Sequence, residues 1–295
     1  MFFLVGPTAV GKSAIALELA PLLNAEIIAA DSMQIYRYLD IATAKPTTRE
    51  QKQVPHHGLD LVEPTFSFSV ADWLTYAQKA IQEIKTRGKT PLIVGGTGLY
   101  IRALRQGLFP SPATSNEMKA TFGSLSLDQL VEKLLKFAPS ATQTIDLKNR
   151  RRVERALAIL QQGGTLQRNN WLQTHHSLAP IFGLTRARED LNHRINHRVK
   201  SMLKAGLEKE YSLFVENRLP SEATAWQALG YRQIQAYREG KISYETCVDR
   251  IKKETRQYAK RQITWFKRET GIQWISLSPE ESPAMTAQRI YEMVS

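Results

Sequence analysis

Cysteine is almost absent from this sequence. The single residue of this type, Cys247, excludes a disulfide within the chain and a cysteine-based zinc site, which favours a reducing compartment. Long apolar runs are also missing, since none approaches the roughly 18 residues needed to span a bilayer. Because Met1 leads directly into an apolar segment, we expect no signal or transit peptide. These absences predict a cytoplasmic protein with no membrane partner.

Acidic residues are scarce relative to basic ones. The 295 residues include 40 Lys and Arg against 28 Asp and Glu, which gives a formal net charge of +12. Residues 186–268 alone hold 19 basic and 10 acidic side chains. An excess of this size indicates a polyanionic partner. The 42% hydrophobic content is sufficient for a buried core, and the length permits one large domain or a core with an insertion.

The octapeptide at residues 6–13 fits the phosphate-binding pattern G-x-x-x-x-G-K-[ST]. It lies between an apolar run that predicts a strand and a segment that predicts a helix, as this loop requires. Backbone N–H groups and the helix N-terminus would face phosphate oxygens, Lys12 adds a full charge, and the Ser13 hydroxyl can bind Mg²⁺. The pattern predicts a polyphosphate ligand without identifying it as ATP. Its residues are Gly6, Pro7, Thr8, Ala9, Val10, Gly11, Lys12 and Ser13.

Short apolar runs predict strands buried on both faces of a sheet. They are Phe2–Val5, Glu26–Ala30, Leu59–Val62, Pro91–Val94, Ile181–Leu184 and Ile272–Leu277. Helical patterns such as Ser69–Arg87 separate the early ones, so we expect an α/β fold with a parallel sheet like that of P-loop NTPases. Ligands of such sheets bind at the carboxyl ends of the strands.

Pro110-Ser111-Pro112 interrupts this alternation, and only helical patterns follow up to His176, with Leu127–Phe137 and Asn149–Leu160 the clearest. We therefore expect a core of residues 1–110 and 177–295 and a helical insertion domain of residues 111–176. Helical patterns resume at Glu189 and continue to Arg268, as a basic helical C-terminal part.

Two more loops follow predicted strands, at Asp31–Tyr36 and Gly95–Tyr100. In a parallel sheet they would meet the phosphate loop at one edge. Asp31 could hold Mg²⁺, as in nucleotide hydrolases, or act as a general base toward a substrate N–H or O–H, or simply cap a turn. Thr97 could hold further phosphate oxygens or belong to a flexible turn.

At this point the sequence resembles one family, the tRNA dimethylallyltransferases or tRNA isopentenyltransferases, whose fold is like that of P-loop kinases. The matching motifs are Gly6–Ser13, Asp31–Tyr36, Ile41–Pro46, Pro55–His57, Val94–Tyr100, Arg152–Leu157, Arg194–Val199, Gly230–Gln233 and Thr255–Trp265. Ala42 departs from the family's glycine, which we expect to adjust a turn rather than abolish activity. Eukaryotic relatives often add a C-terminal zinc finger; a chain with one cysteine that ends at Ser295 is similar to the compact bacterial form.

The resemblance implies transfer of a dimethylallyl group from dimethylallyl diphosphate to N6 of the adenosine 3′ to the tRNA anticodon, with release of pyrophosphate. Asp31 would accept the N6 proton. Thr97 would hydrogen-bond the oxygen that joins C1 to the diphosphate. Arg198 would neutralise the leaving group together with Lys12 and Mg²⁺ at Ser13. The target base must leave its stack to reach these groups.

The resemblance also implies tRNA as partner, and we expect a monomer. The positions implied to contact tRNA are Asp31, Ser32, Met33, Gln34, Thr97, Lys119, Arg151, Arg152, Arg155, Gln227, Gly230, Tyr231, Arg232, Lys260, Arg261, Gln262, Trp265 and Lys267. Residues 250–268 independently hold eight basic side chains and one acidic one, interleaved with aromatics. That pattern favours RNA binding, although an amphipathic helix with a solvated face has the same pattern.

Other functions and sites stay open at this point. A P-loop kinase using ATP leaves the basic C-terminal third unexplained, and an adenylate prenyltransferase using AMP or ADP leaves the insertion unexplained. A non-catalytic RNA-binding protein would not need Asp31 and Thr97. The pairs His56-His57, His175-His176 and His193/His197 could bind a metal, but no carboxylate or cysteine accompanies the first pair and arginines flank the last. A structural role is favoured for all three.

Overall fold

The protein was analysed as a computed structural model, which describes residues 1–108, 114–143, 145–166 and 178–294. The chain divides into two compact units, one of Met1–Arg105 with Thr174–Ser295 and one of Gln106–Gln173. Each unit has hydrophobic clusters of its own.

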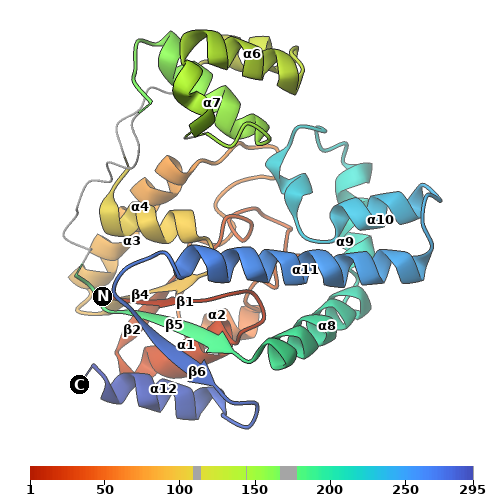
Figure 1. Ribbon diagram of the computed structural model, residues 1–295. Helices are drawn as coiled ribbons and strands as arrows, with labels where there is room; N and C mark the ends of the chain where they lie inside the picture. Colours follow the sequence, from red (N-terminus) through yellow and green to blue (C-terminus); the bar gives the residue numbers. More distant parts are fainter. Residues whose placement is uncertain (109–113, 144, 167–177, 295) are drawn as a thin grey trace. The chain divides into compact units, whose positions relative to one another are not determined.

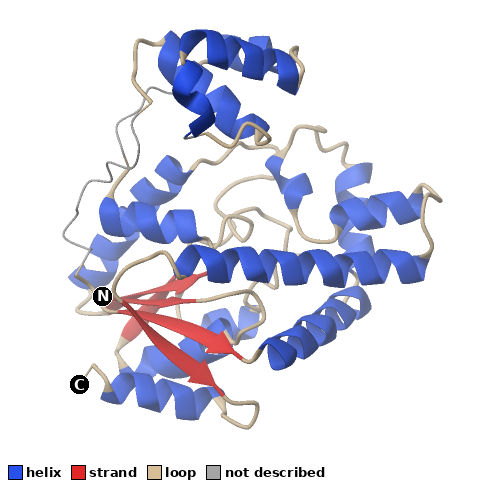
Figure 2. Cartoon of the chain, viewed as in Figure 1, coloured by secondary structure: helices blue, strands red, loops and turns tan. Residues whose placement is uncertain are grey.

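The first unit contains a six-stranded sheet in the order β3-β2-β4-β1-β5-β6, and every neighbouring pair is parallel (Figures 1 and 2). This arrangement confirms the predicted α/β class. The strands are β1 (Phe2–Val5), β2 (Ala25–Ala30), β3 (His56–His57), β4 (Thr90–Gly95), β5 (Ile181–Arg186) and β6 (Ile272–Leu277).

Helices cover both faces of the sheet (Figure 1). Because side chains alternate along a strand, Phe3 and Val5 of β1 pack on one face and Leu4 on the other. The face of Leu4 packs against α1 and α12, and the opposite face against α3, α4, α9 and α10, while α8 and α11 contribute to both clusters. The bounds are α1 (Lys12–Leu22), α2 (Thr48–Gln53), α3 (Val70–Thr86), α4 (Gly98–Gln106), α8 (Arg188–Lys204), α9 (Leu207–Glu216), α10 (Tyr231–Arg238), α11 (Tyr244–Phe266), α12 (Pro283–Glu292) and a 3₁₀ turn, η2 (Thr224–Gln227).

One strand prediction was wrong, and one predicted strand is less buried than expected. Leu59–Val62 is not a strand: Gly58 and Asp60 have φ values of +85° and +52°, which turn the backbone, and Val62 forms only an isolated bridge with Tyr36. The third strand is instead the two-residue β3, which pairs with Ile27 and Ile28. β6 is an edge strand with one side partly exposed, so it is not buried on both faces.

The second unit is helical within its described residues. It contains α5 (Asn116–Gly123), α6 (Leu127–Phe137), η1 (Pro139–Gln143) and α7 (Arg150–Gln161). Leu130 and Leu134 of α6 pack with Val153 and Leu157 of α7 in one cluster. α6 has the predicted bounds, since a capping box of Ser126 and Gln129 satisfies its first N–H groups. In the described part of the chain, no helix is both long and apolar enough to cross a membrane.

Candidate active site at the carboxyl ends of the strands

Residues 6–11 turn the chain from β1 into α1. Gly11 precedes α1 with a φ of +116°, a left-handed conformation that strains any residue with a Cβ. No side chain caps α1, so the first N–H groups of this helix remain available to an anion. Lys12 Nζ donates to the carbonyl oxygens of Gly6 and Pro7 at 2.9 and 2.8 Å, which holds the ammonium group over the loop.

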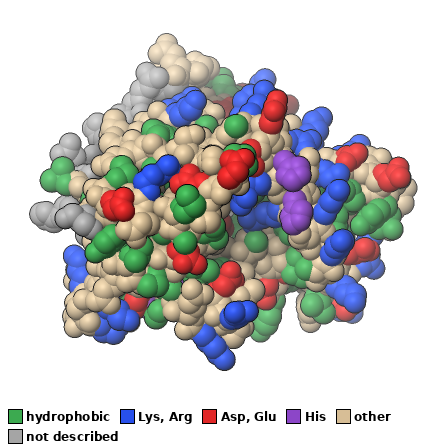
Figure 3. Space-filling view, turned by 90° about the horizontal axis from the view of Figure 1, so that it is seen from below, with side chains coloured by type: hydrophobic (Ala, Val, Ile, Leu, Met, Phe, Trp, Pro, Cys, Tyr) green, Lys and Arg blue, Asp and Glu red, His purple; other side chains and the backbone are tan. Residues whose placement is uncertain are grey.

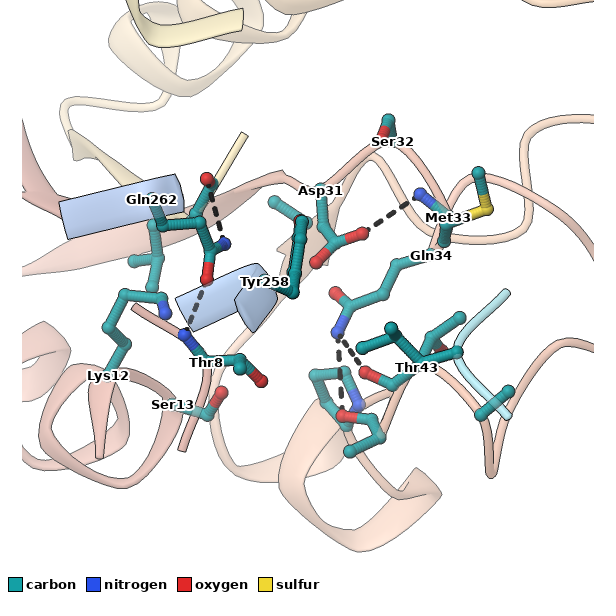
Figure 4. Close-up of a pocket in the computed structure, with 18 of the residues that line it drawn as sticks. Thr8, Lys12, Ser13, Asp31, Ser32, Met33, Gln34, Thr43, Tyr258 and Gln262 are labelled. Carbon is teal, nitrogen blue, oxygen red and sulfur yellow. Dashed lines mark hydrogen bonds between the residues drawn. The ribbon is translucent and has the colours of Figure 1, made fainter. Parts of the chain in front are cut away.

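A cavity of about 320 Å³ opens beside this loop (Figure 4). It lies at the carboxyl ends of β2 and β4, where parallel sheets bind ligands. Its walls combine the phosphate loop, the segments after β2, and side chains of α8 and α11. The polar or charged lining residues are Thr8, Lys12, Ser13, Asp31, Ser32, Gln34, Thr43, His56, Arg198, Gln227, Tyr258, Arg261 and Gln262.

Asp31 follows β2 directly, and its Oδ1 accepts the N–H of Met33 at 2.9 Å (Figure 4). This bond fixes the carboxylate at the cavity wall and leaves Oδ2 without a hydrogen bond among the described residues. Thr97 lies beside it, because its Oγ1 accepts the N–H of Ser32 at 3.1 Å. Thr97 itself is not among the residues that line the cavity, so the structure brings it next to Asp31 without exposing it to the cavity wall.

The segment Ile41–Pro46 supports two further predicted residues. Gln34 Nε2 donates to the carbonyl oxygens of Thr43 and Ala44 at 3.2 and 3.4 Å, and Arg198 Nη2 also donates to Thr43 O, at 3.2 Å. These bonds direct Gln34 Oε1 away from Thr43 and into the cavity (Figure 4).

Gln262 of α11 joins two strand-end loops. Its Oε1 accepts the N–H of Thr8 at 2.8 Å and its Nε2 donates to Gly96 O at 2.9 Å. A Cβ on Gly96 would lie 2.2 Å from Gln262 Nε2, so only glycine allows this approach. Gln262 is buried, which makes its main role the alignment of the phosphate loop with the turn that carries Thr97.

Positive charge is concentrated around the phosphate loop. Burial and the nearby Arg198 lower the pKa of Lys12 from 10.5 to about 7, against the opposing effect of Asp31. Burial also lowers the pKa of Arg198, with Asp31 again opposing. An anionic ligand would offset the desolvation of both cations.

The Ser13 hydroxyl has the chemistry of an Mg²⁺ ligand. The exposed Ser13 hydroxyl and the Asp31 carboxylate line the same cavity. Mg²⁺ commonly takes one or two protein oxygens and completes its coordination with water and substrate phosphates. Within the described ranges, no three His, Cys, Asp or Glu side chains form a metal site by themselves.

The histidine pairs have other surroundings. His57 Nε2 bonds the buried Glu26 carboxylate at 2.7 Å, and His56 Nδ1 lies 2.7 Å from Val54 O, although His56 also lines the cavity. His193 and His197 are exposed on α8. Figure 3 shows histidine side chains close to Lys and Arg side chains on one face of the molecule. His175-His176 lies outside the described residues.

The residues implied to contact tRNA fall into several groups. The cavity is lined by Asp31–Gln34, Gln227, Arg261 and Gln262. A shallow groove on α11 is lined by Lys260, Trp265 and, again, Arg261. Lys267 and Arg232 are exposed. Gly230 precedes α10, and Tyr231 is 1% exposed and donates to Glu210, so its side chain belongs to the core. Arg151, Arg152 and Arg155 lie on α7 of the second unit, and the Lys119 side chain is outside the described part.

Tyr258 lines the cavity, although from the sequence it counted only among the aromatics of a basic helix. It lies one helical turn before Gln262 on α11, and burial together with Asp31 raises the pKa of its phenol. Its ring lies 5.8 Å from the Arg261 guanidinium. The spacing i, i+4 from Gln262 was the available signal, because residues four apart share a helix face.

Comparison with known proteins agrees with this geometry. The IPP transferase family model matches residues 34–269, and an isopentenyl transferase model matches residues 1–65. A tRNA dimethylallyltransferase of Trichlorobacter lovleyi is 40% identical, over 95% of this chain and 94% of that protein. One of Bacillus subtilis is 38% identical, over 99% and 95%.

Solved structures match over nearly the whole chain. The tRNA isopentenylpyrophosphate transferase of Bacillus halodurans is 36% identical, with a TM-score of 0.72 and coverage of 99% of this chain and 94% of that one. A eukaryotic dimethylallyltransferase described as acting on tRNA is 27% identical, with a TM-score of 0.82 and coverage of 98% and 77%. With a family model matching residues 34–269 and relatives about 40% identical along almost its full length, the chain belongs to the IPP transferase family.

Proposed function

We propose that this protein is a tRNA dimethylallyltransferase that modifies N6 of the adenosine 3′ to the anticodon. The observation that carries the proposal is one cavity that joins a phosphate-binding loop to an aspartate and an amide acceptor. In the reaction, N6 forms a bond to C1 of the dimethylallyl group while the C1–O bond breaks and pyrophosphate leaves. The proton lost from N6 passes to Asp31, whose Oδ2 faces the cavity.

The cations and N–H groups of the loop hold the diphosphate. The N-terminus of α1, Lys12 and Arg198 neutralise the negative charge that grows on the leaving group. The Thr97 hydroxyl donates to the oxygen between C1 and the diphosphate. Ser13 would hold Mg²⁺, which would supply electrostatic stabilisation of the leaving group.

The RNA side of the site follows from charge and exposure. Gln34 Oε1 faces the cavity as an acceptor, which suits the exocyclic amine of a flipped adenine. The exposed basic side chains of α11 and of α7 contact the tRNA backbone. We further propose that the protein works in the cytoplasm, where its tRNA substrate is found, and as a monomer.

The experiment supplies purified protein with dimethylallyl diphosphate or ATP, and with tRNA or AMP. We expect prenylated tRNA only with dimethylallyl diphosphate and tRNA. Asp31→Asn should lower kcat by about 10²–10⁴-fold, the usual contribution of a general base, without weakening tRNA binding. Asp249→Asn, on the exposed side of α11, is the matched control and should retain the wild-type kcat. Phosphoryl transfer from ATP, or a wild-type kcat in Asp31→Asn, would contradict the proposal.

A further inference from the structure

The segment Asp40–Pro46 is held in place by a carboxylate that is not part of the cavity wall. Glu210 of α9 is 6% exposed, and its two oxygens accept four hydrogen bonds. Oε2 accepts the backbone N–H groups of Asp40 and Ile41 at 2.8 and 2.6 Å. Oε1 accepts the N–H of Ala42 at 3.0 Å and the Tyr231 hydroxyl at 2.9 Å. Successive N–H groups that converge on one carboxylate fix the backbone that carries them.

The far end of the segment has its own anchor. Lys45 Nζ contacts the carboxylates of Asp40 and Asp60, each at 2.6 Å, and donates to Tyr36 O at 2.9 Å. Between the two anchors lie the carbonyls of Thr43 and Ala44. Ala44 has a φ of +46°, an uncommon conformation for alanine that the anchors must maintain.

The two anchored carbonyls orient functional side chains. Thr43 O accepts both Gln34 Nε2 and Arg198 Nη2, each at 3.2 Å. Because an amide placed with its NH₂ group on carbonyls must present its oxygen on the other side, the segment determines that Gln34 offers an acceptor to the base. The same carbonyl sets the direction of the Arg198 guanidinium.

We infer that Glu210 is a positioning residue for prenyl transfer, which acts through the Thr43 carbonyl on Gln34 and Arg198. The inference rests on the proposed function. Glu210 does not line the cavity, and the effect of its loss is displacement of side chains that do. A misplacement of about 1 Å far from the reacting atoms can cost on the order of 10²-fold in rate.

The test combines kinetics with amide hydrogen exchange in the full chain. Glu210→Gln should lower kcat about 10- to 100-fold and speed exchange at the amides of residues 40–42. Gln34→Ala should cost much less in the Glu210→Gln background than in the wild type, because Gln34 is already released. If Glu210 only stabilised the fold, the fold-losses in kcat of the two single variants would multiply in the double variant.

Matched variants separate this role from charge and from stability. Glu216→Gln removes the same charge from the exposed end of α9. Phe214→Leu destabilises the core on the next turn of that helix. Both variants should keep the wild-type kcat and the wild-type amide protection of residues 40–42. Glu210→Asp keeps the charge and should give intermediate losses, so it replaces Glu210→Gln if that variant does not fold.

The outcomes are distinct for the two proposals. Any of three results would overturn the inference. They are a wild-type kcat in both Glu210 variants, losses in kcat that multiply when Gln34→Ala is added, and unchanged amide exchange at residues 40–42. A wild-type protein that transfers no prenyl group to tRNA would overturn the proposed function, while the exchange measurement would still decide whether Glu210 anchors the segment.

Discussion

Lys12 carries a charge whose presence depends on pH near neutrality. Burial and the nearby Arg198 lower its pKa to about 7, so we expect the ammonium group to lose its proton close to that pH. Binding of a diphosphate favours the charged form and raises this pKa, so binding takes up a proton above pH 7. The dissociation constant of dimethylallyl diphosphate should therefore rise with pH from 7 to 9, by up to about tenfold per unit.

The measurement is calorimetric titration with dimethylallyl diphosphate at several pH values above 7, where phosphate groups with a pKa of about 6 are already ionised. Lys12→Ala is the control: its affinity should be lower and should change little over this range. An affinity of the wild type that is constant from pH 7 to 9 would show that Lys12 is protonated throughout.

Ala42 departs from the family's glycine without straining the backbone. Its φ is not positive, so the position does not demand glycine, and its N–H still reaches Glu210 at 3.0 Å. The backbone accommodates the methyl group at a buried position without left-handed strain. The structure thus explains how alanine fits here.

α11 joins the interior of the site to an exposed basic surface. Tyr258, Arg261 and Gln262 line the cavity, and Lys260 and Arg261 are exposed. Lys260→Ala with Arg261→Ala should weaken tRNA binding and reduce the slope of log affinity against log salt by about 0.7 per lost contact to single-stranded RNA. Binding of dimethylallyl diphosphate should change less than tRNA binding, since the loop of residues 6–13 is intact and only Arg261 of the two lines the cavity.

The measurement is tRNA binding across a salt series at saturating prenyl diphosphate analogue. Lys79→Ala with Lys85→Ala removes the same charge from α3 and should leave the slope unchanged. If the α11 variant kept the wild-type slope and affinity, the RNA surface would have to be sought on α7 instead.

Local patterns predicted most elements because their causes are local. The phosphate loop lies between a strand and a helix that its own neighbours determine, and Ser69 and Asp72 cap α3 one residue from the predicted start. Leu59–Val62 was misassigned because apolar content does not report φ: Gly58 and Asp60 turn the backbone there.

The assembly of the site could not be predicted in the same way. Thr8 and Gln262 are 254 residues apart, and Asp40 and Glu210 are 170 apart. Asp31 and Lys12 could be found because motifs surround them. The motif at Ile41–Pro46 could be recognised in the sequence. How this segment is anchored could not be predicted, since the anchor is the Glu210 carboxylate of α9.

At the scale of the whole molecule, the chain has separate cores that should respond separately to ligands. The buried cluster of the second unit is formed by its own residues, among them Leu134, while the clusters around the sheet belong to the first unit. We expect two thermal transitions by calorimetry. Leu134→Ala, at a fully buried position, should lower only one of them and so assign it to the second unit.

Ligands then test which unit carries which contact. A dimethylallyl diphosphate analogue at a hundred times its Kd stabilises the folded state that binds it by about 2.7 kcal/mol, so it should raise only the transition of the first unit. An anticodon stem-loop should raise both transitions, because basic residues implied in tRNA binding lie on both units. Arg151 and Arg152 are both exposed on α7. Replacing both with Ala should abolish the shift that the stem-loop causes in the transition of the second unit, and should leave the shift of the first unit unchanged. A diphosphate analogue that raised both transitions equally would show that the two units unfold as one.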